Sequence, residues 1–194
     1  MKVGKISDIR IGLPLARKKG DIHDDQFFRY KAVTLKAFSS TGQLLHDELD
    51  EFIASEELSE SYITQEGDIL VRLREPNTAV YIDKESSGLL VPALMAIIKP
   101  KKEINSRYLT HYINSNEAQK RLHKELQGTT IQMLKASELA DLDVTLPPEE
   151  TQEEIVAMLN LANREIELLD TLKSLKTQFK NELLDTILKK EINQ

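Results

Sequence analysis

The sequence predicts a mixed α/β (α+β) globular domain over residues 1–147, followed by one long α-helix over residues 148–194. Short apolar stretches, several with the period of a β-strand and separated by Gly, Pro and Asn, occur in the first region. After Pro148 the chain has no Gly or Pro, and apolar residues recur there at spacings of three and four. These two patterns place the boundary at Pro147-Pro148.

Four apolar stretches predict the strands of the domain. Three of them alternate apolar and polar residues, as half-buried strands do, and the fourth is a continuous apolar run expected of a central strand. In chain order the stretches are residues 33–37, residues 69–74, the segment around Val80 and Ile82, and the continuous run at residues 91–98.

Short helices are expected after the strands. Asn105 or Ser106 can cap a first helix, and residues 114–116 can end it and cap a second helix that stops at Gly128. Residues 137–142 are expected to add one more helical turn.

The long helix is expected to start at a capping box formed by Thr151 and Glu154, just after a short strand at Val144 and Leu146. At about 1.5 Å per residue, this helix is on the order of 60 Å long. We expect it to form an antiparallel coiled coil with a second copy of the chain. The residues of its dimerisation seam are Ile155, Leu159, Ala162, Ile166, Leu169, Leu172, Phe179, Leu183 and Ile187.

The composition is that of a globular protein with 194 residues, of which 40% are apolar and 30% charged. No apolar run approaches the roughly 20 residues of a membrane span, and the absence of cysteine excludes disulfides and thiolate metal sites. We expect a cytoplasmic protein with no membrane contact. The net charge of −6 does not indicate a nucleic-acid binder, so any contact with DNA must come from local basic clusters or be shared with a basic partner.

Sequence signals of catalysis are absent. The seven glycines are scattered, the four histidines are far apart, and no HExxH motif is present. No Asp or Glu stands two residues before a Lys, which excludes a common nuclease element. We therefore expect no catalytic residue and no metal ligand, and favour a binding or assembly protein over a hydrolase.

Three basic clusters can contact a polyanion. Lys and Arg fit phosphates, and Arg, Asn and Thr can also read base edges. We expect the first two clusters to share one DNA-binding face, with an ordinary solvated surface as the alternative. The first cluster is Arg17, Lys18 and Lys19; the second is Arg72, Arg74, Asn77 and Thr78; the third is Lys99, Lys101 and Lys102.

Several motifs, in this order and spacing, resemble the specificity subunit of type I restriction–modification systems. They are Gly67–Val71 with Arg72–Arg74, then Gly128–Gln132, Leu139–Val144, Leu146-Pro147-Pro148, and Gln152 with Ile155-Val156. Two departures stand out: Thr151 precedes the glutamine where the family usually has an acidic residue, and this chain carries one recognition region and one long helix instead of two of each. We interpret Gly128-Thr129-Thr130 as a helix stop and turn.

The resemblance implies a non-catalytic protein whose target-recognition domain reads one half of a split site in double-stranded DNA. Family helices pair antiparallel as a spacer and dock DNA adenine methyltransferase subunits, with restriction and motor subunits also in the complex. S-adenosylmethionine, Mg²⁺ and ATP are expected only in those partners, and no cofactor in this chain. A homodimer would read an interrupted palindrome. The alternative is a coiled-coil adaptor whose α/β domain binds a protein.

Overall fold

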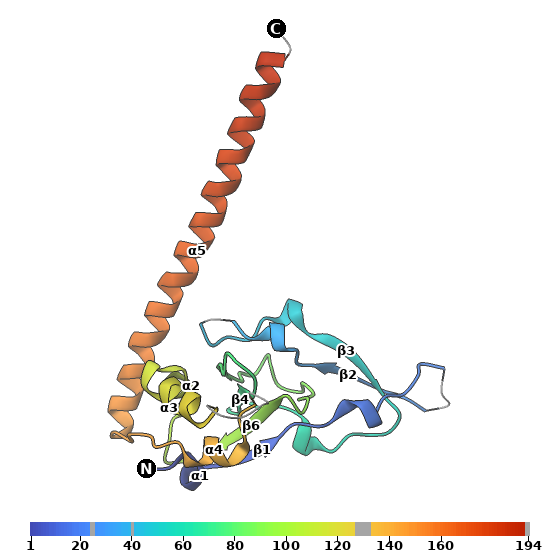
Figure 1. Cartoon of the computed structure of the whole chain (residues 1–194), viewed down its shortest axis with the longest axis vertical. Helices are drawn as coiled ribbons and strands as arrows, with labels where there is room; N and C mark the ends of the chain where they lie inside the picture. Colours follow the sequence, from blue (N-terminus) through green and yellow to red (C-terminus); the bar gives the residue numbers. More distant parts are fainter. Residues whose placement is uncertain (24–25, 40, 127–132, 193–194) are drawn as a thin grey trace. The chain divides into compact units, whose positions relative to one another are not determined.

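The computed structural model describes residues 1–23, 26–39, 41–126 and 133–192. It divides into two units, Met1–Glu154 and Ile155–Gln194. The first unit is a mixed α+β domain, and a single helix, α5 (Glu149–Ile192), begins in its last residues and makes up the second unit (Figure 1). The predicted fold class is thereby confirmed, whereas the pairing of the helix into a coiled coil stays a prediction.

The first unit is organised around an antiparallel four-stranded sheet with the order β1-β6-β4-β5. Strand β6 lies in the middle and pairs with β1 on one side and β4 on the other, so that its Ile98 faces both Ile9 and Ile69. The strands in this order are β1 (Ser7–Ile11), β6 (Met95–Pro100), β4 (Ile69–Arg72) and β5 (Ala79–Tyr81). Because β4 and β6 are apolar on both faces, they are buried on both.

A second sheet consists of the antiparallel pair β2 (Phe28–Ala32) and β3 (Asp50–Ala54). Ala32 of β2 and Ala54 of β3 belong to a small apolar cluster that also contains Leu13, Leu58 and Leu90. A larger cluster lies under the four-stranded sheet and includes Leu70, Val80 and Ile97.

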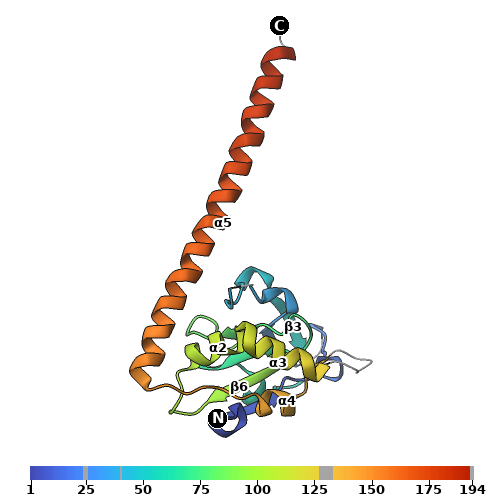
Figure 2. The same ribbon diagram turned by 60° about the vertical axis from the view of Figure 1, so that its left-hand side comes forward.

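Helices complete the first unit. Helix α2 packs on β5, and α4 packs on α1 and β1. Figure 2 labels α2, α3 and α4 of this unit. The helices are α1 (Val3–Ile6), α2 (Ser106–Asn114), α3 (Asn116–Leu126) and α4 (Ala136–Asp141), with single 3-10 turns η1 (Leu15–Arg17), η2 (Leu35–Ala37), η3 (His46–Glu48) and η4 (Glu60–Tyr62). No helix among the described residues is long and apolar enough to cross a membrane.

Several predicted elements are confirmed because local signals fix them. Strands β4 and β5 lie where the alternation placed them. The Asn105 side chain caps α2 by accepting hydrogen bonds from the backbone N–H groups of Arg107 and Tyr108, at 2.9 and 3.2 Å. Helix α4 also matches its predicted turn.

The predicted strand over residues 33–37 is wrong. The strand is β2, which ends at Ala32, and residues 35–37 form η2, whose start the Thr34 hydroxyl caps by accepting from Lys36 N. Val33 and Ala37 are nevertheless buried in the larger apolar cluster. The alternation of apolar and polar residues therefore reflects the burial of Val33 and Ala37, and no strand forms there.

Three further expectations need correction. Residues 91–94 are not strand, because Val91 and Pro92 turn toward Leu13 and only Met95–Pro100 joins the sheet. Val144 and Leu146 form no strand; Val144 N donates to Met1 O at 2.6 Å and the strand-like pairing there is one isolated bridge between Lys2 and Asp143. Helix α5 begins at Glu149, so Thr151 lies inside it and is not its cap.

The first turn of α5 is tied to the domain by buried polar contacts. The Gln152 side chain, 2% exposed, accepts a hydrogen bond from Asn105 N at 2.9 Å and donates one to Pro147 O at 2.9 Å. Two tyrosines of α2 hold the preceding segment: Tyr108 donates to Thr145 O at 2.8 Å, and Tyr112 donates to Asp143 O at 2.7 Å. The domain and the start of the helix are thus one hydrogen-bonded assembly.

We expect Gln152→Ala to lower the free energy of unfolding of the first unit by about 1–3 kcal/mol, because it removes a buried side chain and leaves the partly buried Asn105 N–H and Pro147 carbonyl without partners. Urea denaturation measures the change. The control is Gln178→Ala on the exposed part of α5, where the lost contact is a surface hydrogen bond to Glu182. Equal stability of the Gln152→Ala variant and the wild type would contradict this role.

Candidate nucleic-acid interface and helical surface

The second predicted basic cluster lies at the turn between β4 and β5. Asn77 is fully buried, its side-chain amide N–H donates to Arg72 O at 3.0 Å, and its backbone carbonyl accepts from the Gln119 side chain at 3.1 Å. Thr78 O accepts from Arg72 N at 3.0 Å. Asn77 therefore braces the turn from inside, and its side chain does not face solvent.

Arg72 and Arg74 differ in their surroundings. The Arg72 guanidinium lies over the Phe38 ring, 6.0 Å from its centroid, and donates to Glu75 O at 3.4 Å. Partial burial lowers the pKa of Arg72 from its ordinary value, but the group stays cationic at any physiological pH. Arg74 is exposed, so it is the cation of this turn that solvent reaches most freely.

The first cluster begins at Arg17, the last residue of η1, and continues into the loop that follows, which is hydrogen-bonded along the end of β3. Ser55 N donates to Lys18 O and Gly20 N donates to Ile53 O, each at 3.0 Å. The Lys18 ammonium pairs with Glu56, whereas Arg17 and Lys19 are exposed. A Cβ on Gly20 would lie 2.7 Å from Ser55 N, so only glycine lets the loop approach β3 this closely.

The two clusters belong to different sheets. Arg17, Lys18 and Lys19 lie beside β3 of the two-stranded sheet, and the cluster at Arg72 lies at an edge of the four-stranded sheet. No hydrogen bond or ion pair between described residues joins them. Their sharing of one DNA-binding face stays a prediction, and the exposed cations available to it are Arg17, Lys19 and Arg74.

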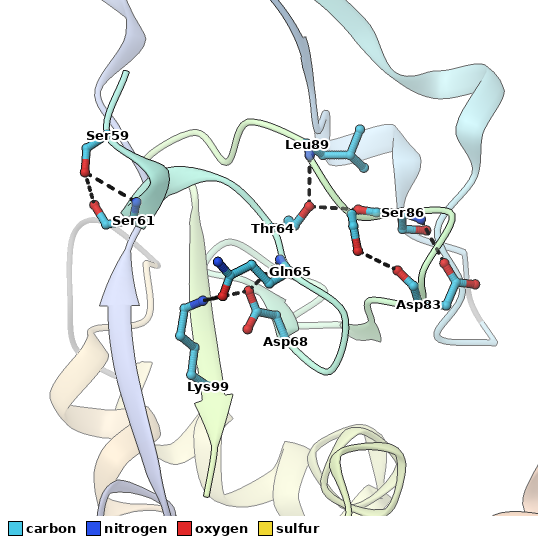
Figure 3. A network of polar contacts seen from close by, with 10 residues as sticks. Ser59, Ser61, Thr64, Gln65, Asp68, Asp83, Ser86, Leu89 and Lys99 are labelled. Atoms are coloured by element: carbon cyan, nitrogen blue, oxygen red, sulfur yellow. Dashed lines mark hydrogen bonds and ion pairs between the residues drawn. The ribbon is translucent and has the colours of Figure 1, made fainter. Parts of the chain in front are cut away.

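Two lysines of the third cluster, Lys99 and Lys101, make contacts within the domain, whereas Lys102 is exposed. Lys99 donates to the Gln65 side chain at 2.9 Å and pairs with the Asp68 carboxylate at 3.2 Å (Figure 3). Asp68 also accepts from Gln65 N at 2.9 Å, which closes the Gln65–Asp68 turn leading into β4. Lys101 donates to Lys5 O at 3.1 Å. Lys99 and Lys101 are therefore held by the fold.

Burial raises the pKa of the Asp68 carboxyl, and the Gln65 backbone N–H and the Lys99 ammonium oppose that rise in pKa. The side chain is 6% exposed. A buried carboxylate with a raised pKa is a recurrent sign of catalysis, but here the group closes a turn and holds a lysine, and its neighbours in the network are ordinary turn residues.

No metal-binding cluster is present in the described parts of the chain. Two of the histidines make contacts within the domain: His123 pairs with Glu75 at 2.9 Å, and His46 contacts the Ser86 hydroxyl at 3.1 Å. Both contacts join segments of the first unit that are far apart in the sequence.

The predicted seam of α5 is largely exposed within the chain. Ile166 is 48% exposed and Phe179 is 66% exposed. Side chains of this kind are usually buried. An apolar surface of such length on one helix is typical of a site where another helix packs.

Helix α5 carries a second set of exposed apolar residues, most of which the predicted seam did not contain. Met158 and Leu161, at 71% and 73% exposed, are in line with Leu168, Leu172, Leu175 and Phe179 at spacings of three and four, apart from one spacing of seven that crosses Glu165. We call these six residues the second stripe. The first stripe, one residue (about 100°) around the helix, contains Ile155, Leu159, Ala162, Ile166, Leu169, Leu183 and Ile187.

The stripes differ in where they are interrupted. Lys173, Lys176 and Lys180 occupy the middle of the first stripe at the positions that continue its spacing, whereas the second stripe is apolar there. Leu172 and Phe179, predicted as part of one seam, fall on the second stripe. The spacing of three and four residues is the same in both stripes, so the predicted seam combined residues of the first and second stripes.

The sequence matches the family model described as the type I restriction modification DNA specificity domain, over residues 31–177. The chain belongs to this family. The match runs from β2 through the recognition region into α5. A comparison with curated proteins gives no match.

Three solved structures share the fold of this specificity-domain chain. A chain from a structural study of complex assembly and conformational transition of the type I R-M system is 20% identical, with a TM-score of 0.61, over 87% of this chain and 39% of that one. The HsdS subunit from Thermoanaerobacter tengcongensis is 16% identical, with a TM-score of 0.56, over 88% and 38%. The type I S subunit from M. genitalium is 13% identical, with a TM-score of 0.52, over 86% and 40%.

This specificity-domain chain thus spans about two fifths of the length of those proteins. Of the motifs that resemble the family, Gly67-Asp68 forms the turn into β4, Leu139–Val144 spans the end of α4, and Gln152 anchors α5. The motif Gly128–Gln132, with our interpretation of it as a helix stop, lies outside the described residues.

The raised pKa of Asp68 predicts how the stability of the folded chain changes with pH. Because the folded pKa lies above the ordinary value of 3.8, the folded chain holds this proton more tightly than the unfolded chain. The contribution of Asp68 to stability is therefore fully present below pH 3.8 and decreases as pH rises through the folded pKa. The stability advantage of the wild type over Asp68→Asn should be larger at acidic than at neutral pH.

Urea denaturation of both proteins across this pH range measures the difference, with the exposed Asp47→Asn as a control for general effects of removing a carboxylate. An advantage that grows toward neutral pH would show that the ion pair with Lys99 outweighs the burial of Asp68.

Proposed function

We propose that this chain is a DNA sequence-specificity subunit of a type I restriction–modification system. In this proposal the first unit reads one half-site of a bipartite target in double-stranded DNA, and α5 sets the spacing and recruits partner subunits. The observation that supports it most strongly is the family match over residues 31–177, which spans both the recognition region and the helix.

DNA contact must be local because the chain carries a net charge of −6. Arg17, Lys19 and Arg74 are exposed, so they are the candidates for phosphate contacts. The candidates for contacts with base edges are Arg74 and Thr78 at the β4–β5 turn. The Asn77 amide, buried in the turn, supports them by fixing the backbone.

Self-association through α5 would supply the second half-site. A closed two-fold dimer uses the same surface on both chains, and antiparallel helices leave one recognition domain attached at each end. Two identical readers related by a two-fold axis read the same bases on opposite strands, so the target would be an interrupted palindrome. The length of the helix would then fix the gap between the half-sites.

The two stripes of α5 support binding of more than one helix, because a single partner covers one seam. We assign the second stripe to a DNA adenine methyltransferase subunit, with restriction and motor subunits joining the complex. Catalysis and the cofactors S-adenosylmethionine, Mg²⁺ and ATP would then reside in those partners, and this chain would be non-catalytic. Such a complex acts on DNA in the cytoplasm.

A coiled-coil adaptor whose α+β domain binds a protein is the second candidate. The acidic net charge and the exposed apolar helix favour it. The two candidates differ in salt dependence, because displacing counterions from DNA makes binding fall steeply with salt concentration.

We predict that Arg17→Ala, Lys19→Ala and Arg74→Ala together weaken DNA binding about tenfold or more in a complex with methyltransferase, and reduce the slope of log affinity against log salt. Gel shifts at several salt concentrations measure both quantities. The purified chain alone should bind DNA weakly and with little selectivity.

A charge-matched control replaces the exposed Lys36, Lys84 and Lys120 with Ala. Unchanged affinity and salt slope in the first variant would remove these three cations from the interface. Salt-independent binding of the wild-type complex would favour the adaptor.

Ile166→Asp combined with Leu183→Asp, both on the first stripe, should abolish self-association while the first unit stays folded. Each fully buried Leu, Ile or Phe contributes about 1.5–3 kcal/mol, and each Asp would carry a charge into the interface. Analytical ultracentrifugation at micromolar concentration should show a dimer for the wild type and a monomer for the variant. The control, Ser174→Asp with Asn181→Asp, adds the same charges to exposed positions on the opposite face of α5. A monomeric wild type would contradict self-association.

A further inference from the structure

The charges in the middle of α5 are divided into two short groups. Glu165 and Asp170, the acidic pair, flank the first stripe on its two sides, and Lys173 and Lys176, the lysine pair, follow within it. All four side chains are exposed. The ion pair within the described part of this segment joins Arg164 to Glu167 at 3.2 Å, and no ion pair joins the acidic or lysine pair to another described residue of the chain.

We propose that these four charges set the register of the α5 pair, with the two-fold axis at Thr171 and each lysine pair bound to the acidic pair of a second copy. This inference rests on the antiparallel self-association proposed above and adds its register and the residues that select the partner.

The axis follows from the heptad spacing. In an antiparallel pair centred on Thr171, Lys173 lies at the level of the other copy's Leu169, next to its Asp170, and Lys176 lies at the level of Ile166, next to Glu165. The lysine stems then cover the apolar residues and the ammonium groups reach the carboxylates at the rim. Each lysine thus has both an apolar contact and an opposite charge.

The apolar ends of the first stripe agree with the same axis. With the centre at Thr171, Ile155 lies opposite Ile187 and Leu159 lies opposite Leu183, so two apolar layers close the interface at each end. All four of these side chains are at least partly exposed in the single chain. Charge and apolar spacing therefore select the same register independently.

Parallel pairing in register would oppose like charges. Lys173 and Lys176 would each face their own copies in the seam, and the flanking Glu165 would approach Asp170 of the other helix, since these two residues hold the g and e positions of successive heptads. Like charges at such positions destabilise pairing. The sequence of α5 thus favours a second copy running in the opposite direction.

A charge-swapped variant tests the register: Glu165→Lys, Asp170→Lys, Lys173→Glu and Lys176→Glu in the full chain. Glu and Lys are both good helix formers, and the net charge is unchanged. Changing only the lysine pair to Glu, or only the acidic pair to Lys, should raise the dissociation constant of the dimer by about tenfold or more at low ionic strength. The fully swapped chain should dimerise as the wild type does.

Mixing wild-type and charge-swapped chains then tests whether the two α5 helices run antiparallel. Wild-type and swapped chains of different mass, equilibrated together and examined by native mass spectrometry, should form mainly the two homodimers, because an antiparallel mixed pair opposes like charges. A preference for the mixed dimer would show parallel pairing and overturn the inference.

Statistical mixing, in which half of the dimers are mixed, would show that these charges do not select the partner and would overturn the inference while leaving self-association intact. A monomeric wild type would contradict both the proposed self-association and the register inferred from it. DNA binding in a gel shift with methyltransferase reports on the proposed specificity function separately from either result.

Discussion

The exposed apolar surface of α5 is the constraint on which the functional interpretation depends. A helix of about 66 Å carries two stripes of Leu, Ile, Met and Phe, most of them around half exposed in the single chain. Burial of such side chains is the largest favourable contribution to helix association in water. The chain therefore has an apolar surface suited to assembly, and the lysines within the first stripe restrict which helix, in which direction, can cover it.

The domain and the helix are joined by hydrogen bonds that a loose linker would lack. Gln152, Tyr108 and Tyr112 tie the segment before and within the first turn of α5 to the rest of the first unit. Such a junction lets the recognition domain and the first turn behave as one piece. In the proposed function, where α5 sets the gap between two half-sites, a firmly held helix start is a useful property.

The sequence predicted what local signals determine and missed what distant contacts determine. Strand β4, the Asn105 cap and the continuous helix follow from short patterns, whereas β1 was missed because its partner β6 lies far along the chain. The alternation at residues 33–37 arose from burial under the four-stranded sheet. Asn77 looked like a base-reading residue, but its contacts with Arg72 and Gln119, neither of which the sequence could place nearby, bury it. The basic residues of the candidate site were identifiable by type, but their exposure and distribution over two sheets were not.

The most direct test of the central claim is the methylation target of a complex that contains this chain as its specificity subunit together with a type I methyltransferase. Methylated adenines can be mapped by sequencing DNA modified by that complex. The account predicts a bipartite target whose two halves are inverted repeats separated by a fixed gap. An asymmetric target, or methylation without sequence preference, would contradict it.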